Sequence, residues 1–329
     1  MDQIQKSPER IAYLDVLRLL ATIAVIWLHV TCADFLSFAG DANYYQSLVY
    51  DSLSRWCVPV FVMISGALFL RPEKRISLKG LYVKSIGRLV ACYVLWALIY
   101  YFVFSYDGAF SLGFLLKPHF HLWFLRMLAF VYVLVPVLRL VAVNEKITLY
   151  CLIVWMVYLF LGFWGRFDLF MLNPVIGYAG YFLLGYYLSQ KTFSKKQVLL
   201  ACLVGLAGLL VTVFGTYVLS EKGHQANERY FSYLSLNVAV MAMPVFIVVK
   251  QWSPKLGKKI LGFSDLVRKD LFGVYLTHAL WLPLVNTVAF RHWCSPLITI
   301  PLITVTVFLL SLALTKLIRL IPGLKKIVE

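Results

Sequence analysis

The stretch LDVLRLLATIAVIWLHV, residues 14–30, is apolar enough to cross a membrane, yet it carries Asp15, Arg18 and His29. A transmembrane helix needs about 20 predominantly apolar residues, and a charged side chain inside the bilayer needs a partner or a wet cavity. At about 100° per residue, the three side chains return to nearly the same face of a helix. Residues 14–30 are therefore predicted to span the membrane with a polar stripe on one face.

The rest of the chain has the composition of a membrane protein. Its 329 residues are 61% hydrophobic and only 14% charged, with a mean hydropathy of +0.81, far outside the range of soluble domains. We therefore predict an all-α polytopic membrane protein, a bundle of about ten transmembrane helices. The ten apolar windows are 14–34, 52–70, 82–104, 121–142, 147–164, 174–190, 197–219, 231–249, 271–290 and 297–318. Since the loops are short, residues 1–329 are predicted to form a single domain with no separate soluble domain.

The distribution of positive charge indicates the orientation of this bundle. Twenty-three of the 31 Lys and Arg residues lie in the termini and in alternate loops, while the opposite loops carry few. Because basic loops stay in the cytoplasm, both termini are predicted to be cytoplasmic. The net charge of +16 is accounted for in this way, so the expected partner of the basic loops is membrane lipid and not nucleic acid.

Four motifs in order along the chain resemble one known family. Arg18 and His29, with ten residues between them, match the Arg/Lys-X10-His signature of acyltransferase family 3. The segments RWCVPVFVMISGALFL (55–70), HLWFLRMLAFVYVLVPVL (121–138) and GVYLTHALWL (273–282) are similar to later motifs of that family. Together the motifs and the ten windows cover essentially the whole chain.

The resemblance implies transfer of an acyl group, usually acetyl, from cytoplasmic acetyl-CoA to a hydroxyl on an extracytoplasmic glycan or its lipid-linked precursor. It also implies a multi-pass protein of the cell membrane, most typically a bacterial plasma membrane. Some members of the family carry a fused extracytoplasmic esterase-like domain. Here the chain ends soon after the tenth window, so we expect the bundle to acylate its acceptor directly or to pass the acyl group to a separate extracytoplasmic protein.

His29 is the principal catalytic candidate. A neutral imidazole can take the proton of a sugar hydroxyl, or carry the acyl group, near physiological pH. The neighbouring candidates are Arg18, which can bind a donor phosphate, and Asp15, whose carboxylate Arg18 can hold. The alternative is that Asp15 and Arg18 form a surface pair while His29 hydrogen-bonds a neighbouring helix.

The phosphates of CoA require cations, and the predicted donor-binding residues are Arg18, Arg71, Arg75, Arg88 and Ser65. Arg88 lies about one turn inside the third window, and the family has an equivalent arginine, so it is the strongest candidate. Two alternatives remain. The run 71–88 can be basic only because it is a cytoplasmic loop, and Ser65 with Gly66 can serve close helix packing.

The predicted acceptor-binding residues are Arg55, His121, Trp123, Arg126 and His278. Each has a structural alternative: an ion pair for the arginines, an interfacial anchor for His121 and Trp123, and a core hydrogen bond for His278. The His119-x-His121 pair is a weak metal signal, and no cysteine cluster or suitably spaced carboxylate accompanies it, so no metal is expected.

A second class of function is a transporter or flippase for a polar solute or a glycan precursor, since buried charges also line permeation pathways. Transport would be favoured by a pair of helices that Gly or Pro interrupts at matching positions in the two halves of the chain. The sequence has no such pair. A membrane sensor is a third class, and it would need no donor site.

Overall fold

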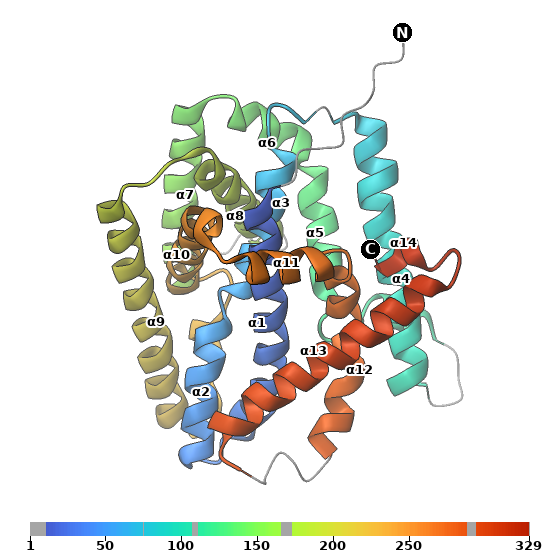
Figure 1. Ribbon diagram of the computed structural model, residues 1–329. Coiled ribbons are helices and arrows are strands. Elements are labelled where there is room, and N and C mark those ends of the chain that lie inside the picture. Colours follow the sequence, from blue (N-terminus) through green and yellow to red (C-terminus); the bar gives the residue numbers. More distant parts are fainter. Residues whose placement is uncertain (1–10, 75, 107–110, 166–172, 288–293, 329) are drawn as a thin grey trace.

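The computed structural model describes residues 11–74, 76–106, 111–165, 173–287 and 294–328, and within these ranges the ordered elements are all helical (Figure 1). Among the described residues, four single helices are long and apolar enough to span a membrane: α1 (Ala12–Ser37), α7 (Glu145–Phe163), α9 (Lys195–Gly223) and α13 (Pro296–Leu320). Three further spans in these ranges combine consecutive elements: α2 (Ala42–Ser54) with α3 (Cys57–Phe69), the π-helix η1 (Gly80–Ile86) with α4 (Gly87–Phe104), and α10 (Leu236–Trp252) with the short turns η4 (Arg229–Phe231) before it and η5 (Ser253–Lys255) after it. The remaining elements are η2 (Leu112–Leu115), α5 (Trp123–Val133), α6 (Val135–Ala142), α8 (Asn173–Gln190), α11 (Lys258–Val267), α12 (Leu271–Thr287) and α14 (Lys325–Val328).

The prediction of an all-α polytopic membrane protein is confirmed, but the number of spans differs. Each of the ten apolar windows contains helix, yet among the described residues seven helices qualify as spans, or eight if α5 and α6 form one bent span. The described part of α12 is apolar over Leu271–Val285, and residues 288–290 of its predicted window lie outside the described residues. α8 carries four tyrosines and three glycines, and most of it is buried inside the bundle, so it needs little apolar surface.

Two spans are interrupted at prolines. α5 and α6 are bent by 56° at Leu134, two residues before Pro136, and α2 passes into α3 through a turn at Arg55 and Trp56. A proline has no N–H to donate to the carbonyl four residues earlier, so Pro59 interrupts the helical hydrogen bonds at Arg55. The predicted second span, 52–70, is therefore the second half of a longer one, Ala42–Phe69.

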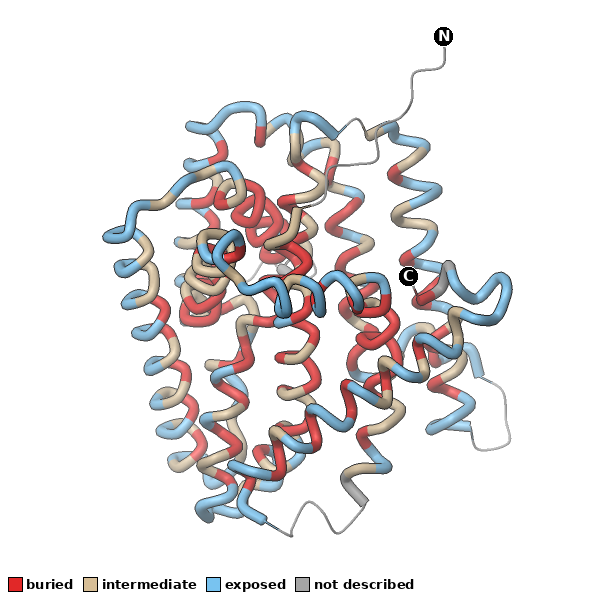
Figure 2. The backbone as a smooth tube through the Cα atoms, in the orientation of Figure 1, coloured by how far each residue is buried: buried red, intermediate tan, exposed pale blue. Residues whose placement is uncertain are grey.

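α1 lies at the centre of the bundle and contacts α2, α3, α10, α11, α12 and α13 (Figure 1). The burial pattern in Figure 2 follows from this arrangement: α1, α3 and α8 are largely buried, whereas α9 and α7 at the periphery expose rows of Leu, Val and Ile side chains. Exposed apolar rows of this kind suit contact with lipid. The described loop residues 70–74, 76–79, 143–144 and 191–194 lie at the same end of the bundle, where α1 begins, and we call this the basic end.

α3 and α8 approach so closely that their backbones touch. A Cβ atom on Gly66 would lie 1.7 Å from the carbonyl oxygen of Phe182, and one on Gly185 would lie 2.0 Å from that of Met63. Small residues permit such contact between membrane helices. The packing interpretation of Gly66 is thus confirmed.

The contact predicts a large difference between two Gly→Ala substitutions. Gly66→Ala should destabilise the protein by about 1–3 kcal/mol, because the added methyl group must separate two backbones. Gly262→Ala in α11 is the matched control, since among the described residues no atom outside the backbone of its own helix turn lies within 4 Å of its added Cβ. Thermal unfolding midpoints in detergent measure both, and equal midpoints would contradict the packing argument.

Candidate active site

A cavity of about 740 Å³ leads inward from the basic end. It is lined by α1, α3, η1, the start of α4, α5, the link between α11 and α12, the start of α12, and Lys325 of α14. The cations in its lining are Arg18, Lys84, Arg88, Arg268, Lys269 and Lys325. No carboxylate is among its described lining residues, although Asp15 pairs with Arg18 and Asp265 with Arg268 outside it. We call it the basic cavity, and it suits an anion of the size of a cofactor.

His29 lies eleven residues beyond Arg18 on α1, which corresponds to about 16 Å of helix. Its ring is half-buried and lines a separate cavity of about 20 Å³, together with His121, Trp123 and Tyr233. A space of this size holds one water molecule or one hydroxyl group. The catalytic candidate therefore lines a small chamber that it shares with residues of α3, α5 and α12.

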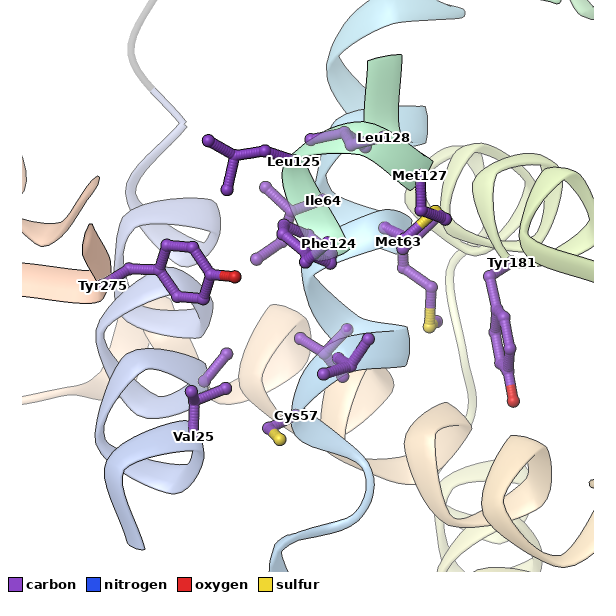
Figure 3. Close-up of a cluster of buried hydrophobic side chains, with 14 of the residues drawn as sticks. Val25, Cys57, Met63, Ile64, Phe124, Leu125, Met127, Leu128, Tyr181 and Tyr275 are labelled. Carbon is purple, nitrogen blue, oxygen red and sulfur yellow. The ribbon is translucent and has the colours of Figure 1, made fainter. Parts of the chain in front are cut away.

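Three aromatic rings separate this chamber from the basic cavity. Phe61 of α3, Phe124 of α5 and Tyr275 of α12 line both spaces, and their ring centroids lie 5.7–6.3 Å apart. Figure 3 shows Tyr275 extending past α1 toward Phe124. We call these three residues the aromatic wall. A thioester on the basic side reaches His29 only where the wall ends or parts.

On its other side, His29 belongs to a cluster of four histidines. The His29 and His278 rings stack with centroids 5.3 Å apart, and the edge of His278 meets His121 at 5.1 Å. Nδ1 of His121 lies 3.2 Å from Nδ1 of His119. The cluster joins α1, α12 and the segment that precedes α5, which are far apart in the sequence.

Tyr275 positions two of these histidines. Its carbonyl oxygen lies 2.6 Å from Nδ1 of His278, and its hydroxyl donates a 2.5 Å hydrogen bond to the carbonyl of His121. Since a carbonyl can only accept, Nδ1 of His278 carries the hydrogen and Nε2 of the neutral ring has the free lone pair. Tyr275 thus fixes both the tautomer of His278 and the position of His121.

His119 also borders a third space, which we call the outer cavity. It has a volume of about 430 Å³ and lies near the end of α4 that is remote from the basic end. The lining includes Tyr100, Tyr101 and Lys117. The ring of His119 stacks on Tyr100 with centroids 4.4 Å apart. Burial lowers the pKa of His119 to about 4, so its imidazole is neutral at physiological pH.

The predicted partnership of Asp15 and Arg18 is present, with Nη1 of Arg18 3.2 Å from Oδ1 of Asp15. Arg18 lines the basic cavity, as do the predicted donor residues Arg88 and Ser65. Arg71 is not in that lining, and its carbonyl accepts a hydrogen bond from Arg139. Arg75 lies outside the described residues.

Arg55 is engaged in an ion pair with Asp51. Nε of Arg55 donates to Oδ1 of Asp51 at 2.5 Å, and Nη2 donates to Oδ2 at 2.7 Å. Both side chains are buried. The guanidinium carbon also lies 4.0 Å above the centre of the Phe231 ring. Its acceptor-binding role stays a prediction, but the ion-pair alternative has a direct geometric basis.

Of the other predicted acceptor residues, three lie at the chamber of His29 and one lies away from it. His121 and Trp123 line the chamber of His29, and His278 contacts it through the His29 ring. His121 is 1% exposed, so it is no interfacial anchor. Arg126 is exposed and lines none of the three cavities, and its Nη1 donates to the carbonyl of Leu116 at 3.4 Å.

Within the described ranges, no group of three or more His, Cys, Asp or Glu side chains has a geometry that could hold a metal ion. The four histidines form a row of stacked and edge-on rings. Their arrangement suits contact between rings and not convergence on one point.

A family model for an acyltransferase domain matches residues 11–316, nearly the whole chain. The chain belongs to acyltransferase family 3. Comparison with curated proteins and with solved structures finds no match. The resemblance inferred from the four motifs is therefore confirmed. This family 3 acyltransferase brings all four to one place: Arg18 with His29, the segment 55–70 through Phe61, the segment around His121, and the helix of His278.

Sequence reasoning missed several residues of the site in this acyltransferase. Arg268 and Lys269 line the basic cavity, but in the sequence they are only two of the many cations in basic loops. In the sequence, His119 stands out only through its weak metal-like pairing with His121. Tyr275 stands inside the GVYLTHALWL motif, three residues before His278, and this helical spacing was the one signal that could have placed it beside the site.

Proposed function

We propose that this acyltransferase is a membrane-bound O-acetyltransferase that moves acetyl from cytoplasmic acetyl-CoA to a hydroxyl of an extracytoplasmic glycan or lipid-linked sugar, in a bacterial plasma membrane. The observation that carries the proposal is the place of His29. Its chamber lies between the basic cavity, at the end that the charge distribution assigns to the cytoplasm, and the outer cavity.

The donor is assigned to the basic cavity on grounds of charge and size. CoA carries several phosphate charges, and Lys and Arg side chains bind phosphate by charge-assisted hydrogen bonds. The cavity gathers six such side chains, and its volume of about 740 Å³ is in the range of cofactor sites. Aromatic residues at its inner end, Phe61, Phe124 and Tyr275, are placed to contact an acyl thioester.

The chemistry is assigned to His29. A neutral imidazole can remove the proton of the attacking hydroxyl or accept the acyl group first, and both routes need the ring within reach of donor and acceptor. The chamber is large enough for one hydroxyl group against the ring. Arg18, paired with Asp15, is then a donor-binding residue on the same helix.

Mass spectrometry of surface glycans tests the function as a whole. Cells with the intact protein should carry an O-acetylated glycan or lipid-linked sugar that is absent from cells without it and absent when only the His29→Gln variant is present. An unchanged set of acetylated glycans would overturn the proposal. Uptake of a solute that depends on the protein and survives His29→Gln would support the transporter instead.

The donor assignment makes a separate prediction about binding. Arg88→Ala should weaken the binding of acetyl-CoA about tenfold to a hundredfold, the effect of losing one charge-assisted hydrogen bond. Lys196→Ala is the control, because Lys196 is an exposed cation at the basic end outside the cavity. Calorimetric titration of the purified protein measures both variants, and equal losses would show that the binding depends on general charge and not on the cavity.

A further inference from the structure

The histidine cluster connects the chamber of His29 to the outer cavity. His29 and His121 both line the chamber, His121 lies 3.2 Å from His119 between their Nδ1 atoms, and His119 borders the outer cavity. His278 packs against both His29 and His121. These four side chains come from three separate segments of the chain.

The nitrogens of this cluster are arranged for proton transfer. Nε2 of His121 and Nε2 of His278 are buried, and neither has a hydrogen-bond partner among the described residues. Leaving a buried polar nitrogen unpaired costs about 1–3 kcal/mol, which suggests that a reacting or transient group meets it. A neutral imidazole can accept a proton on one nitrogen and release one from the other.

On the opposite side of the chamber, the described residues offer no comparable route. There the aromatic wall of Phe61, Phe124 and Tyr275 stands between His29 and the basic cavity. The wall contains one hydroxyl group, and Tyr275 uses it to donate to the carbonyl of His121. A proton released in the chamber therefore has polar carriers toward the outer cavity and aromatic rings toward the basic one.

We propose that His121 and His119 carry the proton of the acceptor hydroxyl from the chamber to the outer cavity, so that each acyl transfer moves one positive charge across the bundle. The proposal rests on the proposed function. The bond between the acyl carbon and sulfur breaks, and the bond between that carbon and the hydroxyl oxygen forms. The hydroxyl proton leaves through His121 and His119, and the thiolate of CoA takes its proton from the basic side.

The balance is the same whether the acyl group passes directly or is first held on His29. In both cases one hydroxyl proton leaves on the outer side and one proton joins the thiolate on the basic side. The acyltransferase is then also an outward carrier of protons, and its turnover responds to the membrane potential.

Inverted membrane vesicles test this directly, because their basic ends face the medium and their lumen contains the cell's own acceptor. Labelled acetyl-CoA is added outside, a pH indicator is trapped inside, and valinomycin with potassium removes the membrane potential. Wild-type vesicles should release about one proton into the lumen for each acetyl group incorporated. Vesicles that contain His29→Gln supply the blank.

Matched substitutions identify the path. His119→Asn should slow both acetyl incorporation and luminal acidification about a hundredfold, since an amide cannot relay a proton. His224→Asn should leave both unchanged, because His224 is exposed at the end of α9, and its backbone conformation, with φ of 48°, is one that asparagine tolerates. Imidazole trapped in the lumen should restore the His119→Ala variant, which a purely structural role of His119 would not allow.

Two results would overturn the relay while leaving the proposed function intact. One is acetyl incorporation by the wild type without luminal acidification, which means that the hydroxyl proton passes to the thiolate. The other is full acidification in His119→Asn. If wild-type vesicles incorporate no acetyl at all, the proposed function fails and the relay fails with it.

Discussion

Replacing His29 with glutamine should lower acetyl transfer about a thousandfold or more, while acetyl-CoA still binds. The first effect follows because glutamine can neither take a proton nor carry an acyl group. The second follows because the aromatic wall separates His29 from the basic cavity that we assign to the donor. Initial rates with labelled acetyl-CoA and calorimetric titration measure the two quantities on the same preparation.

The matched control is His224→Asn, which changes an exposed histidine outside all three cavities. A His29→Gln protein that keeps its transfer rate would remove His29 from the chemistry. A variant that loses binding and transfer together would place the donor on the His29 side of the wall.

Replacing Arg55 with methionine should destabilise the protein by about 3–5 kcal/mol, because it leaves the carboxylate of Asp51 buried and uncompensated in the middle of a span. The double variant Asp51→Leu with Arg55→Met should recover most of this loss, since two apolar side chains replace the ion pair. The midpoints of thermal or denaturant unfolding in detergent report both variants.

The same pair of variants separates two roles of Arg55. If Arg55 serves only the ion pair, the double variant is stable and transfers acetyl normally. If Arg55 also binds the acceptor, the double variant is stable but its KM for the acceptor rises. Equal instability of the single and double variants would contradict the ion-pair account.

The central helix and its polar stripe were predictable from residues 14–30, because the positions of Arg18 and His29 on one face depend only on helical geometry. The start of the second span was not. Asp51 and Arg55 count as two separate charges in a hydropathy profile, so the predicted window began after Asp51. In the fold they neutralise each other one turn apart, and α2 with α3 can lie in the membrane as one span.

The site was predictable in its chemistry more than in its boundaries. Arg88 and Ser65 face the basic cavity as expected, but Arg268 lies 250 residues from Arg18 in the sequence, and only the folded chain shows that both face the same space. Arg126 and Arg71 look equally suitable in the sequence, but neither lines the basic cavity. Composition identifies cations that a membrane protein can place inside, and tertiary packing decides which of them line a common cavity.

The backbone contact between α3 and α8 restricts how a passage through the aromatic wall can open. With Gly66 against Phe182 and Gly185 against Met63, neither helix can slide or rotate without a collision of main chains. Phe61 is thereby carried by one of two helices whose main chains pack directly against each other. Any widening has to come from the helices that carry Phe124 and Tyr275, and a displaced Tyr275 would release its hydrogen bond to His121. Entry of the acyl group and the position of His121 are in this way mechanically linked through Tyr275.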